Sequence, residues 1–252
     1  MTITYELNPP KVIQDTVLSH QELQESVNKF RIKAIEVGKV CESIHVTDSV
    51  LGIPRISPIT AGFFIKNSNS KIRISASIRV RDRNQTAITQ TLCDAILLNL
   101  NGVLILKGDP PPIGPRDSGL VSSEVVKQFN EQGFSKKIDL YLSISSNPDF
   151  DKIHKKIEAQ PKGFVTQIIT SVDQVTRLVD NLKPQGFKVI PCVLISSELN
   201  QKSAKMLNLD WSSYSKDVVG FVKEVNKIAG NVLLSSPNDF KRALEVLKNV
   251  QK

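Results

Sequence analysis

The sequence predicts an α/β fold in which eight strand–helix units close into a (β/α)8 TIM barrel, as a single domain over residues 1–252. Short runs of branched apolar residues alternate with longer amphipathic segments along the chain, which is typical of parallel strands joined by right-handed helical crossovers. The alternation repeats eight times, and 252 residues is the usual length of such a barrel. Eight units favour a closed barrel over an open doubly wound sheet.

The first half of the chain contains four units, separated by clear breaks. Asn8-Pro9-Pro10 stops the first strand, and Gly52-Ile53-Pro54 precedes the second helix. Apolar residues near helical spacing mark the helices, and branched or alternating residues mark the strands. We expect strands at 3–7, 43–47, 71–77 and 102–106, and helices at 21–36, 56–66, 85–98 and 122–129.

The second half repeats the pattern. We expect strands at 137–144, 163–169, 187–195 and 231–234, and helices at 150–159, 172–182, 202–207, 216–228 and 240–247. Ser236 and Pro237 are expected to be the N-cap and the first residue of the last helix. Asp82 or Asn84 is expected to cap the helix at 85–98.

Composition describes an ordinary globular protein, with 40% apolar and 23% charged residues. No apolar run is long enough for a membrane span, since Asn99 and Asn101 interrupt the longest, and the first residues lack the pattern of a secretory signal. Three widely spaced cysteines form no CxxC motif, and this fits reduced thiols in a cytoplasmic protein.

The formal net charge of +8 is spread along the chain, with no basic tail. The scarcity of Trp and Tyr argues against a nucleic-acid groove. The charge suits attraction of an anionic ligand, although a solvated basic surface is the commoner explanation. The sequence also predicts no metal site, because His20, His45 and His154 are far apart, and no nucleotide-binding glycine motif occurs.

The fourth strand ends in the most informative stretch. Gly102–Leu106 is an apolar run that stops at Lys107-Gly108-Asp109, followed by the prolines 110–112. Asp109 is therefore expected at the carboxyl end of a buried strand, where barrels carry their chemistry. A turn in which Asp109 bonds its own backbone is an equally weighted alternative. The other carboxyl ends are expected to add Glu6, Thr47, Ser77, Ser145, Gln167 and Ile195 around the same mouth.

Glu6 and Asp109 could divide the work of acid and base. Glu6 lies between Tyr5 and Leu7, where partial burial would raise its pKa and keep it a proton donor. Lys107 and backbone amides would favour the ionised form of Asp109. Either carboxylate could instead pair with a lysine at the barrel rim.

Several motifs, in order, resemble the methylenetetrahydrofolate reductase family. Thr4-Tyr5-Glu6-Leu7-Asn8-Pro9-Pro10 is similar to its first-strand motif, and Leu106-Lys107-Gly108-Asp109-Pro110-Pro111 to its Arg-Gly-Asp-hydrophobic-Pro segment. Further similar segments are Val46-Thr47-Asp48 through Gly52-Ile53-Pro54-Arg55, Arg81-Asp82-Arg83-Asn84, and Thr166-Gln167. Each motif is weak alone, but five occur in register over nearly the whole chain.

The resemblance implies a flavin-dependent barrel that passes a hydride from a reduced nicotinamide, through FAD, to 5,10-methylenetetrahydrofolate or a related tetrahydropterin. The product would be the 5-methyl form used in one-carbon metabolism and methionine biosynthesis. Glu6 would be the general acid, and Asp109 would favour a cationic intermediate. Gln167 and Leu199, with Asp109, would contact the pterin. FAD would contact Thr47, Ser77, Lys107, Gly108, Asp109, Asp149, Lys152, Lys155 and Lys156.

The chain also departs from the family pattern. Ser77 replaces a histidine common there, Ser145 an aromatic residue, and Lys107 an arginine, while Lys152 and Leu199 stand where Asn and Phe are frequent. These differences keep two alternatives open: a degenerate barrel that binds a pterin or a partner subunit without hydride transfer, and a methyl-transfer subunit. Formation of a homo-oligomer also stays open.

Overall fold

A computed structural model describes residues 2–13, 16–111, 113–114 and 117–251. Eight parallel strands form a closed barrel in chain order, and β8 pairs with β1 to complete it. This confirms the predicted (β/α)8 fold. Pro112, the last of the three prolines after Asp109, lies outside the described residues.

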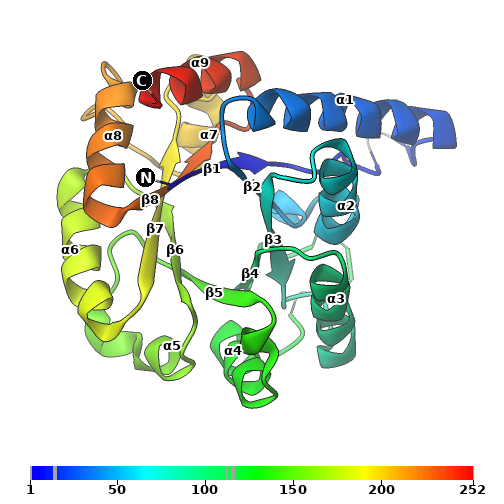
Figure 1. The fold of residues 1–252 in the computed structure, drawn as a ribbon, viewed down its shortest axis with the longest axis horizontal. Coiled ribbons are helices and arrows are strands. Elements are labelled where there is room, and N and C mark those ends of the chain that lie inside the picture. Colours follow the sequence, from blue (N-terminus) through cyan, green and yellow to red (C-terminus); the bar gives the residue numbers. More distant parts are fainter. Residues whose placement is uncertain (1, 14–15, 112, 115–116, 252) are drawn as a thin grey trace.

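The strands form the inner layer, and the helices surround them as an outer ring (Figure 1). The longest helix, α1, extends past the barrel at the upper right of that view. The strands are β1 (Thr2–Leu7), β2 (Ser43–Val46), β3 (Arg73–Arg79), β4 (Gly102–Leu106), β5 (Asp139–Ile144), β6 (Gly163–Ile168), β7 (Lys188–Leu194) and β8 (Asn231–Ser235).

The helices contribute buried apolar stripes toward the strands. The α-helices are α1 (His20–Gly38), α2 (Pro58–Ser68), α3 (Gln85–Leu97), α4 (Ser122–Glu131), α5 (His154–Glu158), α6 (Val172–Leu182), α7 (Gln201–Met206), α8 (Val218–Ala229) and α9 (Phe240–Val250). Short 3-10 helices are η1 (Val50–Gly52), η2 (Phe134–Lys136), η3 (Phe150–Lys152) and η4 (Lys183–Gln185). Within the described part of the chain, no helix combines the length and apolar character needed to cross a membrane.

Two apolar clusters hold the layers together. The larger lies between the strands and the helices and includes Ile44, Ile74 and Phe164, all fully buried. The smaller lies inside the barrel, where Leu104, Val165, Cys192 and Leu233 pack together. This inner cluster lies between the two open ends of the barrel: Leu104, Val165 and Leu233 line a cavity at the amino ends of the strands, and Cys192 lines a groove at their carboxyl ends.

Three local predictions were wrong. The third strand continues past Ser77 to Arg79, because residues up to Arg79 pair with β4. The segment expected as one helix at 150–159 is divided into η3 and α5. The last helix is capped by Asp239, which accepts from the backbone N–H of Arg242, rather than by Ser236. Asn84, one of the two predicted caps of α3, does accept from the backbone N–H of Ala87.

Candidate active site at the carboxyl end of the barrel

A groove of about 810 Å³ opens at the carboxyl ends of the strands. It extends from the strand ends toward α1 and α7, so its walls come from barrel strands, loops and both helices. This volume suits a small organic ligand. Its lining comprises Glu6, Asn8, Pro9, Pro10, Lys11, Ser26, Lys29, Phe30, Lys33, Val50, Leu51, Ile53, Arg55, Asp109, Ile168, Cys192, Leu194, Lys202, Ser203, Met206, Leu207, Ser235, Pro237 and Asn238.

Glu6 brings a half-buried carboxyl group to this groove from β1. The Ser235 hydroxyl, at the end of β8, donates to Glu6 Oε1 at 2.7 Å. Burial raises the pKa of Glu6, and the hydrogen bond from Ser235 opposes that rise only in part. The raised pKa favours a protonated Glu6, which is the state that a general acid requires.

Cys192 lies beside Glu6 in the lining and is buried. Burial raises the pKa of this thiol well above its ordinary value, and the negative charge of Glu6 adds to the rise. A neutral thiol is a weak nucleophile. Cys192 therefore contributes shape to the groove rather than nucleophilic chemistry.

Basic side chains line the outer part of the groove: Lys11, Lys29, Lys33, Arg55 and Lys202. The Arg55 guanidinium donates to the Pro9 carbonyl at 2.6 Å, and the Lys33 ammonium lies 5.4 Å from the centre of the Phe240 ring. Glu6 and Asp109 are the acidic residues of the described lining. The excess of cations favours an anionic ligand.

Asp109 lies at the same groove, so the structure brings it together with Glu6. Its side chain is exposed, and Asp109 Oδ2 accepts from the backbone N–H of Leu51 at 2.8 Å. That bond joins the loop after β4 to η1 after β2. Asp109 thus has a structural role in this state, and its other carboxylate oxygen faces no recorded partner among the described residues.

Arg79, which the sequence did not single out, holds the loops after β2 and β4 together by hydrogen bonds to their backbone carbonyls. It is 1% exposed, and its guanidinium donates to the carbonyls of Ser49 (2.5 Å) and Asp109 (2.6 Å). It also pairs with Asp82 at 2.9 Å. The loop can approach this closely because residue 108 is glycine: it has φ of 80°, and a Cβ there would lie 2.9 Å from Arg79 Cγ.

A second ion pair supports the same region. Asp48, buried after β2, accepts from the backbone N–H of Arg79 at 3.1 Å and from the Arg83 guanidinium. An arginine at the carboxyl end of a strand, where barrels carry their polar residues, was the available signal for this network. The carbonyl groups that accept from Arg79, those of Ser49 and Asp109, lie in loops about 30 residues before and after it in the sequence. Sequence spacing alone could not reveal these contacts.

Gln167 was expected at the mouth with Glu6 and Asp109, but the structure does not place it in the groove. The pairing of β6 with β7 shifts register between Val165 and Ile168. At the shift, Thr166 Oγ1 accepts from the backbone N–H of Cys192 at 3.0 Å and donates to the Gln167 carbonyl. Ile168 consequently lines the groove, whereas Gln167 is exposed outside its lining.

Three further predicted residues also lie outside the groove lining. Thr47 is buried, and its hydroxyl donates to Asn8 Oδ1 at 2.6 Å. Ser77 is buried within β3, where its hydroxyl bonds His45 Nε2 at 2.9 Å. Leu199 is 62% exposed. Thr47 thus contacts the groove indirectly, through Asn8 of its lining.

Other residues that the resemblance assigns to FAD are spread over the β4 and β5 ends. Lys107 pairs with Asp117 at 2.6 Å, and Asp149 caps η3 and pairs with Lys152 at 2.9 Å. The Lys156 ammonium donates to the Ser143 carbonyl at 2.6 Å, and burial lowers its pKa. Lys155 is exposed. These side chains do not form one cleft with Glu6, so the described geometry does not fit a preformed FAD cradle.

No protein-family model and no curated protein sequence matches this chain. Solved structures match it over almost its full length. A deoxyribose phosphate aldolase from Aeropyrum pernix is 13% identical with a TM-score of 0.56, covering 98% of this chain and 89% of its own. The riboflavin lyase RcaE, solved with modified FMN and riboflavin, is 8% identical with a TM-score of 0.66, covering 99% and 90%. Identities this low establish the shared barrel fold alone.

Proposed function

We propose that the chain is a barrel enzyme that reduces an anionic methylene-tetrahydropterin, such as 5,10-methylenetetrahydrofolate, to its 5-methyl form. The observation that carries the proposal is Glu6, a half-buried carboxyl group with a raised pKa at a groove that is rich in cations. The motif resemblance around Glu6 and Asp109 supplies the reaction type.

In the proposed mechanism, the basic side chains bind the acidic groups of the substrate and hold the pterin near Glu6. Glu6 donates its proton to a ring nitrogen, and the imidazolidine C–N bond breaks to leave an iminium cation. The Ser235 hydroxyl keeps the Glu6 side chain in place during this transfer. Asp109, at the same groove, stabilises the cation through its negative charge.

Replacing Glu6 tests the proton transfer. Glu6→Gln keeps the shape and the bond to Ser235 but has no acidic proton, so methylene reduction is expected to fall by about 100-fold or more. Binding of the 5-methyl product, measured by calorimetry, is expected to stay within about two- to threefold. Glu198→Gln, an exposed residue outside the groove lining, is the matched control. Equal losses in binding and turnover would remove Glu6 from the acid role.

The source of the hydride is tested separately. The resemblance assigns it to FAD reduced by a nicotinamide, and FAD when bound would supply that redox chemistry. Titration with FAD, followed by visible absorbance and by thermal stability, decides whether this chain binds it. A saturable spectral change supports the flavin-dependent reaction.

A second candidate is a pterin-binding or methyl-transfer barrel without flavin. The specific observation in its favour is that Lys107, Asp149 and Lys156 are engaged in local contacts rather than gathered at the groove. Saturable pterin binding with no FAD binding, and with no turnover on any electron donor, would favour this candidate.

A further inference from the structure

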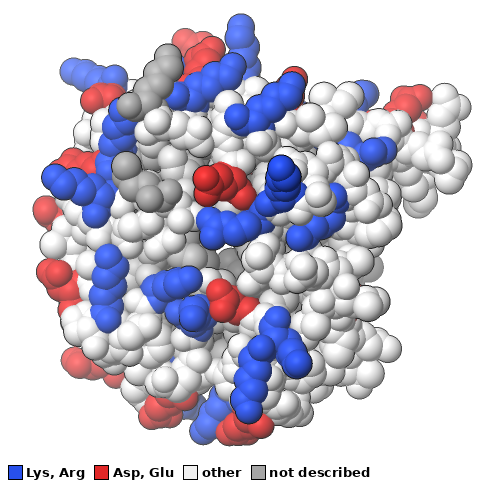
Figure 2. Space-filling view, in the orientation of Figure 1, with Lys and Arg blue, Asp and Glu red and all other residues white. Residues whose placement is uncertain are grey.

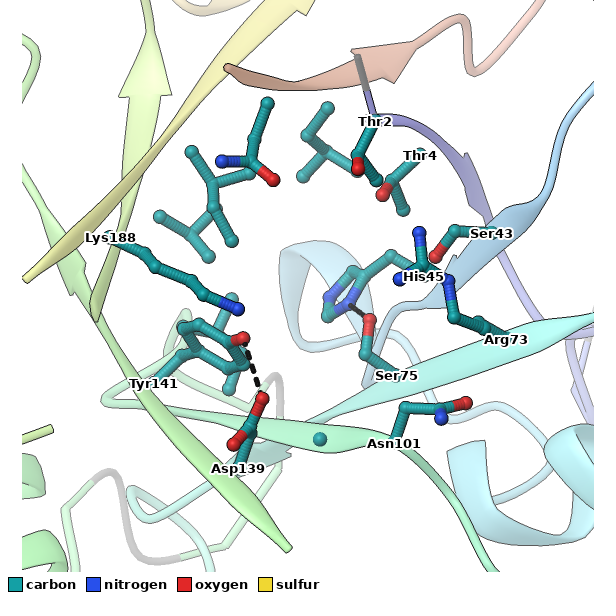
Figure 3. Close-up of a pocket in the computed structure, with 16 residues that line it drawn as sticks. Thr2, Thr4, Ser43, His45, Arg73, Ser75, Asn101, Asp139, Tyr141 and Lys188 are labelled. Carbon is teal, nitrogen blue, oxygen red and sulfur yellow. Dashed lines mark hydrogen bonds between the residues drawn. The ribbon is translucent and has the colours of Figure 1, made fainter. Parts of the chain in front are cut away.

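The opposite end of the barrel contains a separate cavity of about 240 Å³. Its walls are the amino-terminal halves of the strands, and Figure 3 shows their side chains converging on the barrel axis. Apolar residues of the inner cluster, among them Leu104, Val165 and Leu233, form its floor. The lining is otherwise polar: Thr2, Thr4, Ser43, His45, Arg73, Ser75, Asn101, Asp139, Tyr141, Lys188 and Asn231.

Two basic side chains stand on opposite sides of this cavity, Lys188 at the start of β7 and Arg73 at the start of β3 (Figure 3). The Lys188 ammonium is directed inward, toward Tyr141. Over the described residues, neither cation has a recorded hydrogen bond or ion pair, in contrast to Lys107 or Lys152 at the other end. Charged groups that converge without partners point to a ligand of opposite charge.

Neutral donors supplement the two cations. The hydroxyl groups of Thr2, Thr4 and Ser43 face the cavity, and the described residues offer no recorded acceptor for them. Tyr141 donates to Asp139 Oδ2 at 3.1 Å, which holds the phenol ring against the wall. The two cations outnumber the one acidic residue of the described lining, Asp139, so the site favours an anion.

Glycines make room for these side chains. A Cβ at Gly102 would lie 2.9 Å from Tyr141 Cε2, and a Cβ at Gly163 would lie 2.7 Å from Lys188 Cβ and 2.3 Å from the Lys188 carbonyl. Both positions therefore require glycine for Tyr141 and Lys188 to keep their places. The two glycines therefore help to determine the shape of the cavity.

His45 lines the cavity as a neutral side chain and adds no positive charge to it. Ser75 and Ser77 bond its two ring nitrogens at 2.8 and 2.9 Å. Both ring nitrogens thus already have partners. The positive charge of the cavity therefore comes from Lys188 and Arg73.

We propose that this amino-end cavity is a second binding site, which takes a small oxyanion, either a carboxylate or a phosphate, between Lys188 and Arg73. A cavity of this volume has room for phosphate or a small dicarboxylate. Figure 2 views the molecule from this end and shows lysine and arginine side chains, with acidic ones among them, around a central hollow. The proposal is independent of the reaction at the carboxyl end.

Calorimetry with inorganic phosphate and with malonate, at an ionic strength held constant with sodium chloride, tests the site. Wild-type protein is expected to bind at least one of the two saturably, and the stronger one identifies the ligand chemistry. Lys188→Ala and Arg73→Ala are each expected to weaken binding by about 10-fold, which corresponds to one lost charge-assisted contact.

Three control variants locate the binding. Lys162→Ala removes an exposed lysine beside the start of β6 that is not part of the cavity lining, and Lys33→Ala and Lys202→Ala remove cations of the carboxyl-end groove. Lys162→Ala is expected to keep the wild-type affinity within about twofold, and the two groove variants are expected to leave in place the binding event that Lys188→Ala and Arg73→Ala weaken. Absence of saturable binding, equal weakening by every lysine variant, or loss only in the groove variants would overturn the proposal. Thermal unfolding of each variant confirms that it is folded.

Discussion

The two ends of the barrel hold their polar side chains in different ways. At the carboxyl end, Asp109 and its neighbours lie on loops, and a buried Arg79 ties those loops together through backbone carbonyls. At the amino end, side chains such as His45 and Tyr141 project from the strands themselves. A strand is fixed by its ladder of hydrogen bonds, whereas a loop needs added contacts.

This difference sets what each end can do. The loop-built groove is large and its lining changes easily with loop sequence, which suits catalysis on a bulky substrate. The strand-built cavity is small, and each of its residues is constrained by the barrel. The comparison predicts that substitutions at the carboxyl end act through loop contacts and that those at the amino end act through packing and charge.

The largest effect is expected from Arg79→Leu. The change leaves the carbonyls of Ser49 and Asp109 and the carboxylate of Asp82 without their buried partner. Loss of one member of a buried charged network costs about 3–5 kcal/mol of unfolding free energy. Urea denaturation measures it, with the exposed Lys155→Ala as a control that should change stability by less than about 0.5 kcal/mol. A loss below about 1 kcal/mol for Arg79→Leu would mean that the loops do not depend on this residue.

The second prediction concerns pH and His45. Burial lowers the pKa of His45 to about 4 in the folded protein, below its ordinary value of 6.5. As the pH falls below 6.5, the unfolded chain takes up a proton that the folded protein does not, so the free energy of unfolding decreases until about pH 4. The difference between the two pKa values corresponds to about 3 kcal/mol.

Denaturation of wild type and of His45→Asn at pH 7 and pH 4.5 isolates this contribution, since the variant lacks it. If wild type and His45→Asn showed the same pH dependence, the assignment of a buried, neutral His45 would be contradicted.

Glu6, at the other end of the barrel, should change the stability with the opposite sign. Its raised pKa lets the folded protein keep a proton that the unfolded chain releases above about pH 4.5, so this contribution to stability falls as the pH rises.

A smaller effect is expected from Gly163→Ala, which tests the packing of the strand-built end. The new Cβ would lie 2.3 Å from the Lys188 carbonyl, so β6 and β7 must move apart. Overpacking of this kind costs about 1–3 kcal/mol. Gly119→Ala, in a loop where a Cβ meets nothing within 4 Å, carries only the strain of its positive φ and should cost about 1 kcal/mol. Equal unfolding midpoints for the two variants would show that the strands yield as readily as the loop.

The smallest effect is expected from Thr47→Val. The substitution keeps the volume of this buried residue and removes its 2.6 Å hydrogen bond to the Asn8 side chain at the groove. One such bond contributes about 1 kcal/mol to stability. The exposed Thr86→Val serves as the control in the same denaturation experiment. Stability equal to wild type would show that Asn8 finds another partner.

The fold followed from the sequence because each strand carries a local signal. Gly102–Leu106, for example, is apolar throughout because both of its faces are covered. Where strands end depends on their neighbours instead. The strand that contains Ser77 continues to Arg79 because Arg79 pairs with Leu106 of β4, which no property of residues 71–79 alone reveals.

The candidate site could be predicted only in part. Glu6 and Asp109 were expected at one mouth, and they line one groove. The basic lining of that groove was not foreseen at Lys29, Lys33 or Lys202, because these residues come from helices whose orientation the sequence pattern does not fix. Their roles, like those of the residues assigned to FAD, stay predictions until binding is measured.

The register shift in β6 matters for anyone redesigning this barrel. Counting residues along the strand suggests that position 167 faces the groove, but the extra residue at the shift gives that position to Ile168. A designer who wants an amide against a bound ring should therefore substitute Ile168 and leave Gln167 unchanged. Removing one residue at the shift would turn the outer end of the strand over and offer a different set of side chains to the same groove.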